Sequence, residues 1–331
     1  MLGARSRCPE EVTADGNGRI DTHCHVIPPG YCDWLEAQPG YRGPRFDWSP
    51  ESALGAFDSL DVETGILSLS TPGVWIDRHT CASEATAWAR RVNEYCAELV
   101  RAQPDRFGFF ATVPLPDVDA AVTEARYALE TLHADGVVLM SNTDGVYPGA
   151  PHWDPLMDVL DAEAATLFVH PTGPPSAPLP GVAAALVDFP AETTRAAVNL
   201  CAHGCPQRYP NIAVLLSHAG GFLPYVASRI STLAPVVAPA LAESLTQEAL
   251  RSFWFDTALS GNPYALPSLL AFADPDRVTF GSDWPHAPLE TARQFTDALD
   301  LALPHAQSAP VARDNAETLL PRLTARKATT R

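Results

Sequence analysis

The chain has 331 residues, of which 46% are hydrophobic and 18% charged, and its formal net charge is −17 at pH 7. This is a globular composition, and a (β/α)8 barrel accommodates such a length as a single domain. The acidic balance provides no basic face for a nucleic-acid backbone, and no apolar run is long enough to span a membrane. We therefore expect neither a nucleic-acid partner nor a membrane partner.

The cysteine and lysine content limits the classes of catalytic mechanism that this chain can use. The seven cysteines are scattered, odd in number and without CxxC spacing, so we expect reduced thiols and a cytoplasmic location. The only lysine is Lys327, near the C-terminus. Schiff-base chemistry, a pyridoxal-phosphate anchor and a P-loop all need an internal lysine, so these are excluded. A carbamylated lysine bridging two metals is excluded as well, which favours a single metal ion.

Eight short apolar runs alternate with helix-length segments. A polar arm (1–18) precedes them, and a polar tail (321–331) follows the predicted barrel, which spans residues 19–320. Strands that alternate with helices indicate parallel βαβ units, and eight such units close a barrel. The predicted strands are 19–25, 65–70, 107–112, 136–140, 166–170, 212–217, 253–256 and 278–281, with amphipathic helices at 83–103, 119–133 and 153–164.

Two long Pro- and Gly-rich loops interrupt this rhythm, at 26–50 after the first strand and at 171–182 after the fifth. Loops that follow barrel strands lie at the C-terminal face, where the chemistry of such barrels takes place. We expect these loops to wall a pocket there.

Polar residues end several of the apolar runs. His23 and His25 stand two residues apart at the end of the first run, so both point to the same face of the strand, where they can share a metal ion. His170 ends the fifth run, His218 the sixth, and Asp283 follows the eighth. Burying such groups costs several kcal/mol, on the order of 2–7, unless they are paired or bind an ion. Four strand ends with this pattern indicate a site.

These residues also carry a resemblance. IDTHCHVIPP (20–29), FVHP (168–171), LSHAGGFLPYVASRI (216–230) and FGSDWP (280–285), in this order, resemble the decarboxylase branch of the amidohydrolase superfamily. This branch includes aminocarboxymuconate-semialdehyde, γ-resorcylate and 6-methylsalicylate decarboxylases. The resemblance covers about residues 19–320, and segments 66–73 and 106–117 look closest to the 6-methylsalicylate enzymes.

The resemblance implies roles for individual side chains. One divalent ion, Zn²⁺ or Mn²⁺, would be ligated by His23, His25, His170 and Asp283. Asp21 would either join the ligands or support them from behind, and we favour support. His218 would be the catalytic acid or base, with Asp283 as a further proton donor. Substrate would be bound by Arg229 (in its own chain or across a dimer interface), Arg45, Trp284 and His286.

Two further features have a more structural interpretation. Gly220 and Gly221 are expected to allow a tight turn that keeps His218 facing the ion. Trp75 is a plausible aromatic wall for a planar substrate, although tryptophan often simply packs in a core.

The implied function is non-oxidative decarboxylation of an aromatic, ortho-hydroxylated or conjugated carboxylic acid, by a homodimer without an organic cofactor. Two alternatives stay open. The same ligands serve metal-assisted hydrolysis of a lactone, ester or amide, and a non-catalytic barrel that binds a metabolite would show the same fold.

Overall fold

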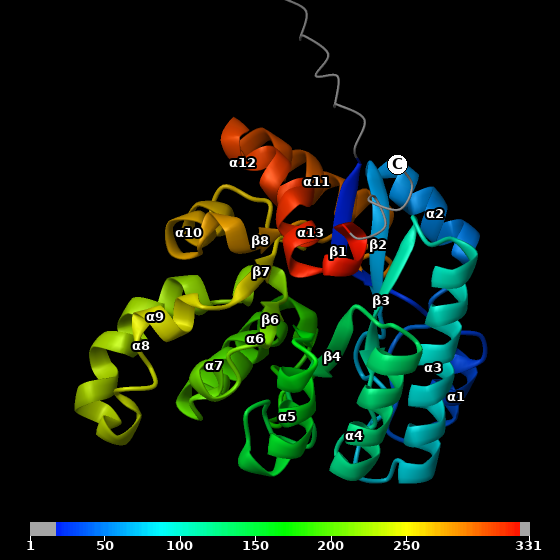
Figure 1. Ribbon diagram of the computed structural model, residues 1–331, viewed down its shortest axis with the longest axis horizontal. Coiled ribbons are helices and arrows are strands. Elements are labelled where there is room, and N and C mark those ends of the chain that lie inside the picture. Colours follow the sequence, from blue (N-terminus) through cyan, green and yellow to red (C-terminus); the bar gives the residue numbers. More distant parts are fainter. Residues whose placement is uncertain (1–17, 325–331) are drawn as a thin grey trace, which may run out of the picture.

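The computed structural model describes residues 18–324, in which eight parallel strands follow one another around a barrel (Figure 1). Hydrogen bonding runs from each strand to the next, and a bridge between Asp21 and Phe280 joins the last strand to the first. The predicted (β/α)8 barrel is therefore confirmed. The strands are β1 (Arg19–His25), β2 (Val62–Ser68), β3 (Phe107–Thr112), β4 (Gly136–Met140), β5 (Thr166–His170), β6 (Ala213–Leu216), β7 (Trp254–Asp256) and β8 (Val278–Thr279).

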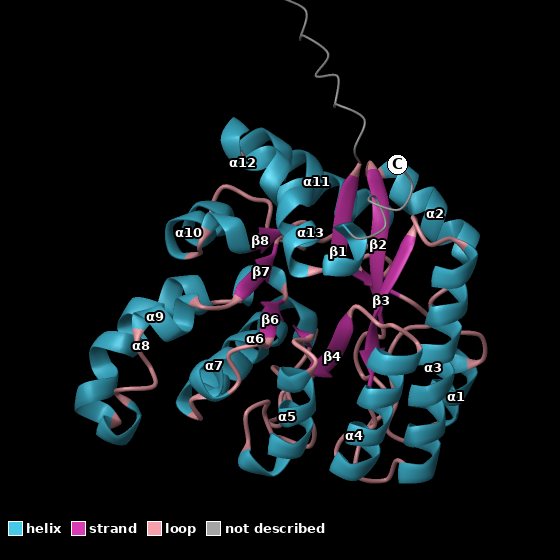
Figure 2. Cartoon of the chain, viewed as in Figure 1, coloured by secondary structure: helices cyan, strands magenta, loops and turns pink. Residues whose placement is uncertain are grey.

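Helices surround the strands (Figure 2). They are α1 (Tyr31–Ala37), α2 (Pro50–Ser59), α3 (Ala82–Ala102), α4 (Val118–Arg126), α5 (Asp154–Ala162), α6 (Ala184–Ala202), α7 (Cys205–Arg208), α8 (Leu223–Val237), α9 (Gln247–Arg251), α10 (Ala265–Phe272), α11 (Leu289–Ala302), α12 (His305–Ala309) and α13 (Asn315–Leu319). The three helices predicted from amphipathic spacing match α3, α4 with the helical turn that follows it, and α5. None of the helices within residues 18–324 is both long and apolar enough to cross a membrane.

The structure differs from the prediction in several element boundaries and in one additional helix. The expected 26–50 loop contains α1, whose Tyr31 and Leu35 are buried one helical turn apart. β2 begins at Val62 instead of residue 65, and β8 ends at Thr279. The packed chain continues past the predicted boundary at 320, since Leu323 is buried. The arm up to residue 17 and the tail from residue 325, with Lys327, lie outside the described residues.

The hydrophobic core has two layers, and neither fills the interior of the barrel at the carboxyl ends of the strands. Inside the barrel, one side chain from each of six strands forms a compact cluster: Ile20, Ile66, Phe110, Val138, Phe168 and Leu215. Leu319, Leu320 and Leu323 join this cluster and close the barrel at the end where β1 starts, and α13 lies beside β1 there (Figure 1). The second layer packs between strands and helices. The interior at the carboxyl ends of the strands is thus left to polar groups.

Candidate active site

Four side chains from β1, β5 and the turn after β8 meet inside the open end of the barrel. One nitrogen or oxygen of each of His23, His25, His170 and Asp283 lies within 4.8 Å of the corresponding atom of the others. Nε2 of His25 is 3.0 Å and Nε2 of His23 is 3.3 Å from Oδ1 of Asp283. All four residues are buried. The prediction that these side chains converge is confirmed, and their role as ligands stays a proposal.

Local backbone features bring these groups together. β1 changes register against β2 between Asp21 and Cys24. Ile20 therefore faces the interior cluster, whereas Cys24 packs in the outer layer, although simple alternation would give both the same face. This irregularity turns His23 inward, where its ring centroid lies 5.0 Å from that of Phe168. Asp283 adopts a left-handed backbone with φ of 61°, and its N–H donates to the carbonyl of His23 at 2.8 Å.

The four groups have complementary charges. Burial lowers the pKa of His25, and lowers that of His170 well below its usual range, so both rings are neutral. Burial would raise the pKa of Asp283, but hydrogen bonds from His218, His23 and His25 hold it well below its usual range. Burial also acts to lower the pKa of His23, yet the Asp256 and Asp283 carboxylates raise it to about 10. In the absence of a cation, His23 therefore holds a proton.

The donor set fits one divalent metal ion. Nε2 of His170 is buried and makes no hydrogen bond with any of residues 18–324, and Nε2 of His23 is buried with only Oδ1 of Asp283 nearby, at 3.3 Å. Buried polar atoms without partners are costly, and imidazole nitrogens are the commonest metal ligands. Three imidazoles and one carboxylate suit a four-coordinate site for Zn²⁺ or a related ion.

Asp21 lies beside the four converging side chains. Its Oδ1 accepts hydrogen bonds from the backbone N–H groups of His23 at 3.0 Å and Ser282 at 3.1 Å. Burial raises the pKa of Asp21 to about 7. Its carboxylate is not among the atoms that converge. This arrangement supports the reading in which Asp21 fixes the backbone beside the ligands instead of ligating.

His218 follows β6 in a left-handed turn. His218, Ala219, Gly220 and Gly221 have φ of 54°, 58°, 72° and 63°. A Cβ atom on Gly221 would lie 2.0 Å from the carbonyl oxygen of Pro190, so only glycine fits, as the predicted tight turn requires. The turn places Nε2 of His218 3.4 Å from Oδ2 of Asp283 and leaves its Nδ1 without a hydrogen-bond partner in the described chain.

Asp256 is a member of the site that sequence reasoning missed. It closes β7, is fully buried, and its Oδ2 lies 2.7 Å from Nδ1 of His23. Its Oδ1 accepts from the backbone N–H groups of His218 and Ala258, both at 2.9 Å. The available signal was its place at the end of an apolar strand, the same pattern that identified His170.

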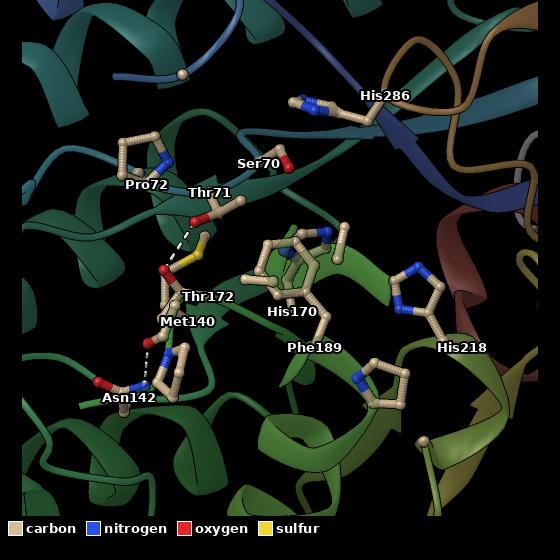
Figure 3. Close-up of a pocket in the computed structure, with 18 of the residues that line it drawn as sticks. Ser70, Thr71, Pro72, Met140, Asn142, His170, Thr172, Phe189, His218 and His286 are labelled. Carbon is tan, nitrogen blue, oxygen red and sulfur yellow. Dashed lines mark hydrogen bonds between the residues drawn. The ribbon is translucent and has the colours of Figure 1, made fainter. Parts of the chain in front are cut away.

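A cavity of about 1970 Å³ opens over the cluster, and His170, His218, Asp283 and His286 contribute to its lining. In Figure 3, His218 lies on one side and Thr71, Thr172 and Met140 on the other, with Phe189 between them in this view. The hydroxyls of Thr71 and Thr172 are hydrogen-bonded at 2.7 Å. The expected loops contribute as well, through residues 40–44 and 172–175.

Three of the four predicted substrate residues do not line this cavity. Arg45 is exposed, and its guanidinium pairs with Asp33 at 2.8 Å and with Glu36 at 3.1 Å instead of lining the cavity. Trp284 is buried away from the cavity and packs edge-on against Phe57. Arg229 is exposed on α8. It does not reach the cavity of its own chain, so its role across a dimer interface stays a prediction.

Other residues line the cavity instead of Arg45, Trp284 and Arg229. His286 lines the cavity as predicted, and burial lowers its pKa to about 3, so its ring is neutral. Trp75 also lines it, with its Nε1 donating to Asp144 at 2.9 Å. The arginines that the cavity lining does include are Arg42 and Arg78, both of which are exposed. No sequence motif distinguishes these two arginines from Arg45.

Comparison with known proteins agrees with this geometry. The amidohydrolase family model matches residues 20–322. The chain is 38% identical to decarboxylase yanB of Aspergillus niger, covering 92% of this chain and 88% of that protein. It is also 38% identical to 6-methylsalicylic acid decarboxylase of Penicillium expansum, covering 92% and 97%. A crystal structure described as amidohydrolase II superposes with a TM-score of 0.85 at 30% identity, covering 92% and 99%. The chain belongs to the amidohydrolase family and, within it, to the branch of carboxy-lyases that contains the 6-methylsalicylic acid decarboxylases.

Proposed function

We propose that this enzyme is a metal-dependent, non-oxidative decarboxylase that acts on an aromatic carboxylic acid with an ortho hydroxyl group and releases carbon dioxide. The observation that carries the proposal is the convergence of His23, His25, His170 and Asp283 beneath a cavity that also exposes His218. The name of the Penicillium expansum relative, 6-methylsalicylic acid decarboxylase, supports the same substrate class.

Zn²⁺ is our first choice of metal and Mn²⁺ the alternative, because three imidazoles and one carboxylate accept both. When bound, the ion supplies a Lewis acid for the carboxylate and the neighbouring hydroxyl oxygen of the substrate. The chain's part is to present the nitrogens of His23, His25 and His170 in their neutral form. For His25 and His170 burial already ensures this, whereas His23 has to release its proton.

The reaction needs one proton at the ring carbon that bears the carboxylate. Protonation there interrupts the aromatic ring, and the electron pair of the breaking C–C bond then restores it as carbon dioxide leaves. His218 is the donor we propose, because it lines the cavity beside Asp283 and is not one of the four converging groups. Oδ2 of Asp283 lies 3.4 Å from Nε2 of His218, a contact that orients the ring.

The cavity walls suit a planar ring. Phe189, Met140 and Trp75 offer apolar surface. The paired hydroxyls of Thr71 and Thr172 offer hydrogen bonds on the side of Met140 (Figure 3). Arg42 and Arg78, two exposed residues of the cavity lining, provide positive charge for an incoming carboxylate.

One experiment separates decarboxylation from the alternative, hydrolysis of a lactone, ester or amide. The metal-loaded enzyme is incubated with salicylate-type acids, including 6-methylsalicylate, and in parallel with aromatic lactones and esters. The proposal expects stoichiometric carbon dioxide and the decarboxylated phenol from the acids. Turnover of lactones or esters with no carbon dioxide from any acid would reject it.

We also propose that the enzyme is a homodimer. Large apolar side chains are exposed on α6 and α8, among them Leu186, Tyr225, Val236 and Val237. Large apolar side chains that are left exposed to water suit a subunit interface. Light scattering coupled to size-exclusion chromatography tests this, and a mass near the 35.5 kDa of one chain would contradict it.

A further inference from the structure

Asp256 joins two parts of the site that come from different strands. Oδ2 lies 2.7 Å from Nδ1 of His23 on β1, and Oδ1 accepts from the backbone N–H of His218 after β6. Asp256 is fully buried, and it does not line the cavity. It therefore reaches neither the substrate nor the point where the ligand atoms converge, and any effect on the reaction acts through His23 and His218.

The contact to His23 selects one tautomer. An ionised carboxylate only accepts hydrogen bonds, so Nδ1 of His23 must carry a proton when it faces Asp256. The lone pair of the neutral ring then resides on Nε2. That atom is the one that points toward Asp283, at 3.3 Å. A carboxylate behind a ligating imidazole fixes both the orientation of the ring and its capacity to bind an ion.

The contact to His218 stabilises an unfavourable backbone. His218 and Ala219 both adopt left-handed φ angles, which L residues other than glycine seldom do. The same Oδ1 atom also accepts from the N–H of Ala258, which anchors the carboxylate to its own strand end. Asp256 thus connects the turn that carries His218 to the rigid end of β7.

We propose that Asp256 is a positioning residue that sets the affinity of the site for its metal ion through His23 and holds His218 in place for proton transfer. The inference rests on the proposed metal site, but not on the identity of the substrate. Metal affinity is measured without substrate, so a failure here is distinguishable from a failure of the decarboxylase assignment.

The decisive variant is Asp256→Asn, which keeps the size of the side chain. Its amide oxygen can still accept from His218 and Ala258, which leaves the NH₂ group facing Nδ1 of His23. A donor at this position favours the tautomer with its proton on Nε2, which cannot ligate. We expect the affinity for Zn²⁺, measured by competition with a chromophoric chelator, to fall about 10- to 100-fold. At saturating Zn²⁺, kcat should fall while KM for the acid stays within about twofold.

Asp135→Asn is the matched control. Asp135 is a buried carboxylate that accepts from the backbone N–H of Phe109 and pairs with Arg322, away from the metal cluster. The Asp135→Asn substitution should leave the affinity for Zn²⁺ within about twofold of wild type. In a His23→Asn background, Asp256→Asn should weaken zinc binding by less than about threefold further, because the two changes act on one interaction.

A folded Asp256→Asn protein, with wild-type circular dichroism and with zinc affinity and kcat within twofold of wild type, would overturn the proposal. If this variant does not fold, the wild-type protein itself provides the test. In the zinc-loaded form, nitrogen-15 NMR of the histidine side chains should show His23 protonated at Nδ1 and bound through Nε2. Binding through Nδ1 would refute the role of Asp256.

Discussion

Nε2 of His25 lies 3.0 Å from Oδ1 of Asp283, although 258 residues separate them in the chain. The contact exists because β8 returns to the side of β1, where the bridge between Asp21 and Phe280 closes the barrel. The site therefore depends on closure of the whole sheet, and its residues can be tested separately for metal binding and for proton transfer.

His218→Ala should abolish turnover while the metal content stays near one ion per chain. His218 is not among the four converging ligand groups, so its loss removes only the proton donor, a change on the order of 10²- to 10⁴-fold in kcat. Metal analysis and steady-state kinetics check this. His152→Ala, at an exposed position, is the control and should behave like wild type. Retained turnover in His218→Ala would contradict the assigned role.

Removal of the metal ion should abolish activity and lower the melting temperature. An ion that binds only the folded state stabilises it by about 2.7 kcal/mol at a concentration 100 times its Kd. After treatment with a chelator, Zn²⁺ and Mn²⁺ are added back separately, and differential scanning fluorimetry is run beside the assay. Full activity in protein shown to be free of metal would exclude the proposed centre.

Metal affinity should increase as the pH rises. Burial lowers the pKa of His23, but Asp256 and Asp283 raise it to about 10, so the metal-free site holds a proton throughout the neutral range. Metal binding must displace this proton, so the apparent affinity should rise by up to about tenfold per pH unit below that pKa. Titrations at pH 6, 7 and 8 test this. A Kd that does not change with pH would show that no proton is displaced.

Arg45→Ala should leave kcat/KM unchanged, because the guanidinium pairs with Asp33 and Glu36 outside the cavity. Exposed pairs of this kind contribute about 0–1 kcal/mol to stability, so the melting temperature should change little. Arg78→Ala, which alters the cavity lining, should instead raise KM for the acid, and the difference should shrink at high salt. The opposite ranking of the two variants would restore Arg45 as a substrate residue.

Gly221→Ala should destabilise the protein by about 1–3 kcal/mol and reduce activity, because the new Cβ meets the carbonyl of Pro190 at a left-handed φ. Gly55→Ala in α2 is the matched control. A Cβ there meets nothing within 4 Å, so the helix should gain about 0.5–1 kcal/mol. Chemical denaturation measures both changes, and a neutral Gly221→Ala would remove the structural reason for this glycine.

The fold and the converging cluster of His23, His25, His170 and Asp283 could be predicted from sequence because their signals are local. Each strand is a short apolar run, and a histidine or aspartate at its end is visible without knowledge of its neighbours. Asp256 shows the limit of this reasoning. It ends a three-residue strand, and its importance is set by His23 and His218, which are distant in the chain and adjacent in space.

The substrate arginines could not be ranked from sequence for a related reason. Arg42 and Arg45 lie in the same loop, three residues apart, yet the cavity lining includes Arg42, whereas Arg45 turns to Asp33 and Glu36. The path of an irregular loop depends on packing against several other segments, and its side-chain directions follow no fixed period. The side chain of Trp284 is likewise buried in the core, where it packs against Phe57.

The sequence by itself determined the order of strands and helices and the identity of the polar residues at the strand ends, because both follow from hydrophobic periodicity. The tertiary structure alone decided which of those residues share one site, which carboxylate supports which imidazole, and which arginines face the cavity. These depend on barrel closure, on the register change in β1 and on the left-handed turn at His218, which arise from contacts between segments far apart in the chain.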